Sequence, residues 1–283
     1  MARLILSLLC IIFLNTWAGD EFSPAARAQT ASAASRGTAL ARQVEARDIG
    51  RDARTALRMK LHDRRGRVRE RALTVVTMRG GPGRPVDGDR TLIRFTYPND
   101  IAGTGFLVWD HPDAEDERFL YLPSLGRTRR IAANETQESF VGSDFTYEDI
   151  GGREFDDYTY AILPATGAAA VWRNADGRAH RVQRLESTSR DPNARFPRIV
   201  SLVHTESLVI VGGEIYNRRD QVQKRFLVKR LERVGGYWTA LELEMKDEIE
   251  GSRTELVLES VEYNVGLSPD AFTRRELERG RLP

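Results

Sequence analysis

Ser143 is the most tempting nucleophile of this 283-residue chain, and its four histidines are the candidate bases. A hydrolytic serine commonly lies in a G-x-S-x-G turn with a histidine base beside it. The sequence Val-Gly-Ser-Asp-Phe at residues 141–145 lacks the second glycine. The histidines are far apart along the chain and show no metal-binding spacing such as H-E-x-x-H; they are His62, His111, His180 and His204. We therefore predict no catalytic residue, and the alternative is a hydrolase whose triad forms only in the folded chain.

A cluster of carboxylates follows this serine and could in principle bind calcium. Its members are Glu148, Asp149, Glu154, Asp156 and Asp157. Calcium loops of the EF-hand type place their ligands at regular positions, and that spacing is missing here. We predict that no metal is bound and that the cluster forms a solvated acidic rim facing nearby arginines.

Arg127, Arg129 and Arg130 form a cluster of the opposite charge. Guanidinium groups form charge-assisted hydrogen bonds with phosphates and carboxylates, so these arginines could contact an anionic lipid headgroup or an acidic partner surface. The alternative is the exposed edge of a strand, where charged residues are common. Because Arg129 and Arg130 are adjacent, they must point to opposite faces of a strand, and the sequence leaves both interpretations open.

The charge distribution argues against a nucleic-acid partner. The chain has 43 Lys and Arg residues against 41 Asp and Glu residues, and acids alternate with arginines along almost every segment. Nucleic-acid binding usually requires a clustered basic field instead. The single cysteine, Cys10, lies inside the N-terminal apolar run, so a processed chain has no thiol for a disulfide, for catalysis or for a metal. We expect no cofactor.

The N-terminus has the organisation of a secretory signal peptide. Arg3 precedes an apolar run at residues 4–14, and Ala26-Arg27-Ala28 provides an A-x-A cleavage site. A retained membrane anchor is the alternative, but the run is shorter than the roughly 20 residues that a spanning helix needs. We predict that residues 1–28 are removed and that the mature chain starts at Gln29.

The candidate residues must be positioned mainly by strands, because period-two alternation dominates the sequence after Gly50. Residues 29–50 are predicted to form a leader, mobile over 29–40, and one short helix over 40–48. Residues 51–283 are predicted to form a single domain. Apolar and polar residues alternate at 57–62, 93–97 and 237–246, which is typical of antiparallel strands with one wet face. Such a sheet has to curl to hide its apolar face.

Two segments resemble a known bacterial family. Residues 119–131, Phe-Leu-Tyr-Leu-Pro-Ser-Leu-Gly-Arg-Thr-Arg-Arg-Ile, and residues 139–149, Ser-Phe-Val-Gly-Ser-Asp-Phe-Thr-Tyr-Glu-Asp, are similar to the signature of LolA-like outer-membrane lipoprotein-sorting proteins. The similarity continues at residues 91–95, 103–109 and 261–273. It implies a mainly β (α+β) fold, an incomplete antiparallel β-barrel (a LolA/LolB-like half-barrel) whose mouth is plugged by short helices. We expect these helices at residues 131–138, around 147–149 and at 274–279.

The predicted site is an apolar cavity under a lid. Strand alternation can gather a cavity wall on the concave face, and the expected members are Phe95, Phe106, Trp109, Leu120 and Leu122. The expected lid consists of Phe140, Phe145 and Tyr147 around Gly142, because glycine permits a turn that other residues resist. The alternative is that these aromatic residues are ordinary core.

The resemblance also implies a function and partners. It indicates a periplasmic carrier of lipid, lipoprotein acyl chains or a similar amphiphile in a Gram-negative envelope, and not an enzyme. The implied partners are the cargo, an inner-membrane transporter of the RND or MMPL type and an outer-membrane acceptor. The alternatives are an enzyme on the same scaffold acting on a lipid-like substrate, and a non-catalytic envelope interaction protein.

Overall fold

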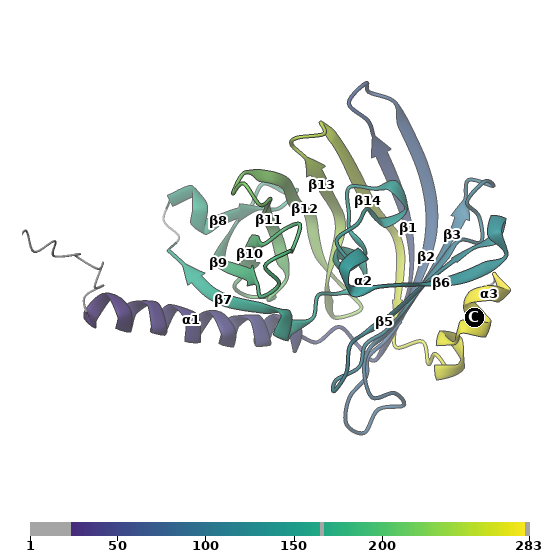
Figure 1. Cartoon of the computed structure of the whole chain (residues 1–283), viewed down its shortest axis with the longest axis horizontal. Helices are drawn as coiled ribbons and strands as arrows, with labels where there is room; N and C mark the ends of the chain where they lie inside the picture. Colours follow the sequence, from purple (N-terminus) through teal and green to yellow (C-terminus); the bar gives the residue numbers. More distant parts are fainter. Residues whose placement is uncertain (1–23, 165–166, 281–283) are drawn as a thin grey trace, which may run out of the picture.

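The protein is a strongly curved, open antiparallel sheet with few helices, as the computed structural model of residues 24–164 and 167–280 shows (Figure 1). Thirteen strands follow one another in the order β6-β5-β4-β3-β2-β1-β14-β13-β12-β11-β10-β9-β7, and β8 also pairs with β9. The sheet ends at β6 and β7 and does not close, so the predicted incomplete β-barrel is confirmed.

The strands are β1 (Asp52–His62), β2 (Val68–Met78), β3 (Arg90–Tyr97), β4 (Gly105–Trp109), β5 (Glu117–Leu122), β6 (Arg127–Ile131), β7 (Tyr158–Leu163), β8 (Val171–Arg173), β9 (Ala179–Ser189), β10 (Arg198–His204), β11 (Ile210–Tyr216), β12 (Val222–Val234), β13 (Tyr237–Asp247) and β14 (Ser252–Tyr263).

Pairing between the first and last strands joins the two halves of the sheet. β1 pairs with β2 on one side and with β14 on the other, and Met59 is opposite Leu256 in this register. The predicted alternation is visible in β13, where Leu241 and Met245 are buried and Lys246 is exposed. Because successive side chains point to opposite faces of a strand, one row of apolar residues lines the concave face.

Helix α1 (Pro24–Glu45) packs along β7 and β9 at one end of the sheet (Figure 1). Leu40 and Ala41 are buried there with Leu185 and Val203. Gly37 makes the close approach possible, since a Cβ atom at this position would lie 2.5 Å from the Cα atom of Ala161.

The N-terminal helix is longer than the sequence pattern predicts. The expected short helix at 40–48 ends at Glu45, and the segment expected to be a mobile leader at 29–40 is helical. Its many alanines explain the difference, because alanine has the highest intrinsic helix propensity. Residues 1–23, which hold most of the predicted signal peptide, lie outside the described residues, and cleavage before Gln29 stays a prediction.

The convex face of β3–β5 has its own cover. The 3₁₀ turn η6 (Pro269–Phe272) and helix α3 (Arg274–Arg279) bury Phe272 and Leu277 against Leu92, Leu107 and Phe119. The helix expected at 274–279 therefore exists, but the prediction that it plugs the mouth is wrong, because it lies on the opposite face of the sheet. No helix within residues 24–164 and 167–280 is long and apolar enough to span a membrane.

Candidate functional site

A segment with little regular structure crosses the concave face, and we call residues 133–151 the plug. It contains the 3₁₀ turns η2 (Ala133–Glu135) and η3 (Phe140–Gly142) and the helix α2 (Tyr147–Gly151). The predicted short helices at 131–138 and around 147–149 correspond to η2 and α2. Thr146 caps α2 by accepting a hydrogen bond from the Asp149 amide at 3.1 Å.

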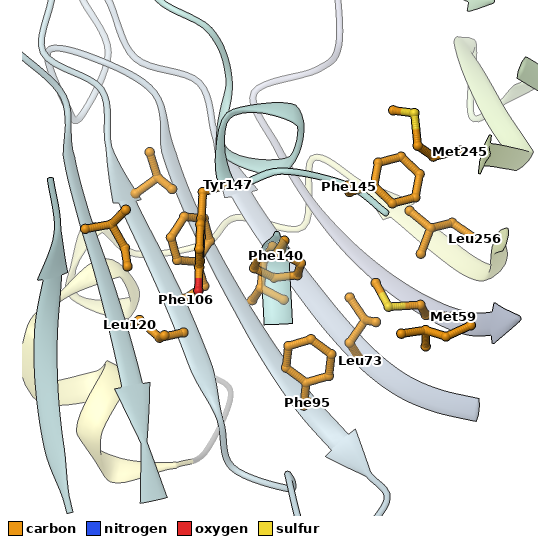
Figure 2. Packing of buried hydrophobic residues seen from close by; sticks show 14 of the residues in the cluster. Met59, Leu73, Phe95, Phe106, Leu120, Phe140, Phe145, Tyr147, Met245 and Leu256 are labelled. Carbon is orange, nitrogen blue, oxygen red and sulfur yellow. The ribbon is translucent and has the colours of Figure 1, made fainter. Parts of the chain in front are cut away.

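Phe140 is the centre of an aromatic cluster on the concave face. Its ring is 5.9 Å from Phe95, 5.4 Å from Phe106 and 5.6 Å from Tyr147 (Figure 2). Phe140, Phe95 and Phe106 have no exposed surface, and Leu120 is also buried in this cluster. The structure thus brings together most of the residues predicted as wall and lid, but it packs them directly against one another. Leu122 is partly buried at the margin of the cluster.

Trp109 does not belong to this wall. Phe106 and Trp109 are three residues apart in β4, and odd spacing in a strand places side chains on opposite faces. Trp109 packs on the convex face, 5.2 Å from the ring of Phe119, and its indole Nε1 donates to the Phe272 carbonyl at 2.6 Å. The prediction that it shares the concave wall with Phe106 is wrong.

Asp144 fastens the plug to the far half of the sheet. Its carboxylate accepts hydrogen bonds from Thr254 Oγ1 at 2.6 Å and from Ser252 Oγ at 2.5 Å. The buried Lys224 donates from Nζ to the Asp144 carbonyl at 2.6 Å. On the other side, the buried Arg71 donates to the Val141 carbonyl at 2.6 Å. Burial lowers the pKa of both Lys224 and Arg71, yet each charge is matched to a carbonyl of the plug.

The turn between Phe140 and Asp144 has an unusual backbone. Val141 and Gly142 both have positive φ angles, 49° and 73°. This conformation suits glycine and is uncommon for a β-branched residue. The expected turn at Gly142 is therefore present, and it includes Val141, which the sequence pattern does not reveal.

A cavity of about 280 Å³ lies on the concave side between the plug and β10–β13. Most of the residues that line the cavity are apolar. Phe145 lines it from the plug, and Figure 2 shows its ring beside Met245. Its other apolar lining residues are Ile199, Val209, Ile210, Ile215, Phe226, Val228, Ala240 and Met245. Gly212 and Gly213 of β11 also line it. Gly213 is opposite Ser201, whereas a Cβ atom at Gly212 would point toward Leu202 and away from the cavity. The cavity thus lies beside β10–β13 and away from the β3–β5 wall that the sequence suggested.

Four polar side chains line the same cavity: Arg47, Asp149, Arg153 and Ser201. Arg153 forms ion pairs with Asp149 and, at 3.3 Å, with Glu148. Burial alone would lower the pKa of Arg153, but the Asp149 and Glu148 carboxylates raise it, and the guanidinium is charged and paired. Glu148 is buried, and burial raises the pKa of its carboxyl group.

Arg47 is different, because no carboxylate in the described residues lies within ion-pair distance of it. Its Nη1 donates to the Val44 carbonyl at 3.2 Å, near the end of α1. Its Nε is buried and has no hydrogen-bond partner in the described part of the chain. Burial, and then the neighbouring Arg79, lower the pKa of this guanidinium. Sequence reasoning missed Arg47 because nothing in its local pattern distinguishes it from the many other arginines.

A larger opening of about 780 Å³ lies outside, between the loops at 79–89 and 110–116 and residues 151–156. It is lined by eight carboxylates and shares Arg153 with the apolar cavity. Asp116 is buried at its edge, where Arg118 Nη2 donates to it at 2.8 Å. Burial and the neighbouring Asp110 raise the pKa of Asp116 to about 7. Within the described residues, no three or more His, Cys, Asp or Glu side chains are grouped so that they could hold a metal ion.

The predicted acidic rim is only partly exposed. Glu148 and Asp149 pair with Arg153, Glu154 lies 3.8 Å from Arg118, and Asp156 and Asp157 are exposed. The predicted proximity of these carboxylates to arginines is therefore present for Glu148, Asp149 and Glu154.

In the part of the chain that the structure describes, Ser143 has no histidine as a hydrogen-bond partner. Ser143 Oγ donates to the Phe145 carbonyl at 3.5 Å, and His62, which lines the same opening as Ser143, lies 3.6 Å from Glu255. His204 contacts Ser207 at 2.7 Å and His180 at 3.2 Å, in a buried aromatic cluster with Trp172.

Arg127, Arg129 and Arg130 lie on β6, which is an edge strand. Arg129 is opposite Leu120 and Arg130 is opposite Phe119, so the two side chains point to opposite faces, as expected. Arg129 pairs with Glu135 at 3.0 Å. All three are exposed, and contact with a headgroup or partner stays a prediction.

Comparison with other proteins extends these observations. A family model described as an uncharacterized protein matches residues 87–279. The chain is similar to the solved structure of a DUF1329 family protein from Desulfovibrio piger, with 27% identity and a TM-score of 0.75 over 87% of this chain and 99% of that one. It is also similar to a domain from Vibrio parahaemolyticus described as an outer membrane lipoprotein-sorting protein, with 27% identity and a TM-score of 0.76 over 87% and 100% of the chains.

A more distant similarity concerns the fold alone. A LolA superfamily protein from Nitrosomonas europaea has 14% identity and a TM-score of 0.62 over 86% of this chain and 99% of its own. No curated protein matches the chain.

Proposed function

Because the chain belongs to the LolA-like family of outer-membrane lipoprotein-sorting proteins, we propose that it is a periplasmic carrier that holds the acyl part of a lipid, lipoprotein or similar amphiphile in its concave cavity. The observation that carries this proposal is the apolar cavity between Phe145 and β10–β13. Small-molecule sites are typically concave, mostly apolar and equipped with a few placed polar groups.

The physical driving force is burial of hydrocarbon. Each CH₂ group removed from water contributes about 0.8 kcal/mol, so a short chain is enough for useful affinity. Transfer to an acceptor needs no covalent step. It requires only an acceptor with greater affinity, or a second conformation of the plug with lower affinity for the cargo. An inner-membrane transporter of the RND or MMPL type and an outer-membrane acceptor are the partners that we propose.

Lipid analysis of the purified protein tests the proposal. The protein is isolated from the periplasmic fraction, extracted with organic solvent and examined by mass spectrometry. We expect a co-purifying amphiphile, and N-terminal sequencing of the same sample should begin at Gln29. Turnover of a lipid ester would support an enzyme instead, and a protein without lipid and without fatty-acid affinity would support an interaction protein.

Filling the cavity provides a matched mutational test. Ser201 is buried on the cavity wall and is opposite Gly213, which has no side chain. Ser201→Leu should therefore occupy the space and weaken binding of a fluorescent fatty acid. Leu202→Phe is the control, because Leu202 is adjacent in β10, faces away from the cavity and lines a groove on the convex side. Equal binding by the wild type and Ser201→Leu would place the ligand elsewhere.

A further inference from the structure

Among the charges that line the apolar cavity, Arg47 stands apart. It lines an apolar cavity, its Nε is buried without a partner, and no carboxylate in this part of the chain pairs with it. A buried charge is costly unless it is paired. Proteins therefore rarely keep such a group without a counter-ion, and this cavity is the space that a counter-ion can reach.

The other charges on the cavity wall are already neutralised. Arg153 pairs with both Asp149 and Glu148, so this group of three leaves no uncompensated positive charge for a ligand. Of the described residues on the wall, only Asp149 is a carboxylate, and it pairs with Arg153. Among the described residues, an anion entering the cavity would thus find one open cation, Arg47, beside a hydrocarbon surface formed by residues such as Val209 and Ile210.

We infer that the cavity selects a single-chain anionic amphiphile, whose carboxylate or phosphate head binds the guanidinium of Arg47 while its chain lies along β10–β13. This inference rests on the proposed carrier function and adds the class of cargo. The volume supports one chain: 280 Å³ lies just below the roughly 300–1,000 Å³ of typical ligand pockets. An arginine also suits the head, because its planar fork matches carboxylate and phosphate oxygens.

A hydrogen bond to the end of α1 is the competing role for Arg47. Its Nη1 contacts the Val44 carbonyl, and cations are favourable near a helix C-terminus. In that role the residue would affect stability and all ligands alike. Headgroup binding instead predicts a selective effect on anions.

Isothermal titration calorimetry with matched amphiphiles separates these roles. The probes are dodecanoate, dodecyl phosphate and uncharged dodecanol, with acetate and inorganic phosphate as headgroups without a chain. For the wild type we expect both anionic amphiphiles to bind more tightly than dodecanol, and the small anions to bind far more weakly than either. Arg47→Gln should reduce the affinity for the two anionic amphiphiles about 10- to 100-fold, the usual effect of a lost charged hydrogen bond. Its affinity for dodecanol should not change, which also shows that the variant is folded.

Two further variants complete the test. Arg47→Lys keeps the positive charge but loses the planar guanidinium that can form two parallel hydrogen bonds, so it should retain part of the preference for anions. Arg36→Gln removes an exposed arginine from α1, the helix that ends two residues before Arg47, and should behave like the wild type.

Each contrary result has a distinct meaning. Dodecanol bound as tightly as dodecanoate by the wild type, or an equal loss of both in Arg47→Gln, would overturn the headgroup assignment and leave the carrier intact. Inorganic phosphate bound as tightly as dodecyl phosphate would show a free-anion site and overturn it as well. If no amphiphile binds at all, both the carrier and its headgroup site are rejected.

Discussion

Asp144 and Thr254 exchange two hydrogen bonds across the concave face. Thr254 Oγ1 donates to the Asp144 carboxylate at 2.6 Å and accepts from the Asp144 amide at 3.0 Å. Thr254 is fully buried in β14. The pair therefore connects the plug to the sheet at a site where water cannot replace a missing partner.

Asp144→Ala should destabilise the fold. It leaves the Thr254 hydroxyl without its acceptor, and an unpaired buried polar group costs about 1–3 kcal/mol. Urea unfolding should show a loss of this size in the free energy of unfolding. Asp157→Ala, at an exposed carboxylate close in sequence, is the control and should change little. Equal midpoints for both variants would mean that the plug is not held by this contact.

Phe140 and Phe145 should respond differently to substitution. Phe140→Ala removes a ring that contacts three other rings and should lower the free energy of unfolding by about 3–5 kcal/mol. Phe145→Glu places a carboxylate on the cavity wall and should abolish fatty-acid binding, because an unpaired charge in an apolar site is costly. Thermal unfolding and binding of a fluorescent fatty acid are measured on both variants. A folded Phe145→Glu protein that still binds the probe would contradict the location of the cavity.

Asp116 should make stability depend on pH. Burial and Asp110 raise its pKa to about 7 in the folded protein, whereas an unfolded aspartate titrates near 3.9. Between these values the folded state binds the extra proton, so the free energy of unfolding should fall as the pH rises from about 4 to about 7. Asp116→Asn should flatten this slope in urea titrations, and Asp113→Asn, at an exposed position, should leave it unchanged. A wild-type stability that rises over this interval would show that other groups dominate.

The arginines of β6 should mediate binding to anionic membranes. Replacing Arg127, Arg129 and Arg130 with glutamine should weaken sedimentation with anionic vesicles at low salt, since charge attraction is screened beyond about 10 Å at 0.1 M. The matched control replaces Arg64, Arg65 and Arg67, three exposed arginines at the β1–β2 turn. If the two triple variants bind anionic vesicles equally well, the β6 arginines are only solvated side chains at an exposed strand edge.

Local alternation predicted the fold well but did not locate the cavity. Alternation such as that of β13 indicated an antiparallel sheet that must curl, and the family resemblance at residues 119–131 and 139–149 implied the half-barrel with a plugged mouth. The cavity arises from long-range packing, because Phe145 meets strands that begin more than fifty residues later. Gly213, which is opposite Ser201 and adds no side chain to the cavity wall, carries no signal of this role in the local sequence.

The two errors of placement share one cause. Residues 106–109 are apolar on both faces of β4, which indicates that both faces are covered. Helix α3 covers the second face, where Leu277 packs in one hydrophobic cluster with Leu107 and Trp109. The local sequence does not show which segment covers that second face, so alternation alone could not place Trp109 and α3 there.

The pairing of β1 with β14 also sets the order in which the molecule can be completed. A chain made from its N-terminus has β1 available early, but the other partner of β1 begins only at Ser252. Until then one edge of β1 remains unpaired, and the plug lacks its attachment at Thr254. Contacts so distant in sequence close large loops, which slows folding. The two halves of the sheet therefore become one cooperative structure only when nearly the whole chain is present, and a chain shortened before β14 lacks the strand that unites them.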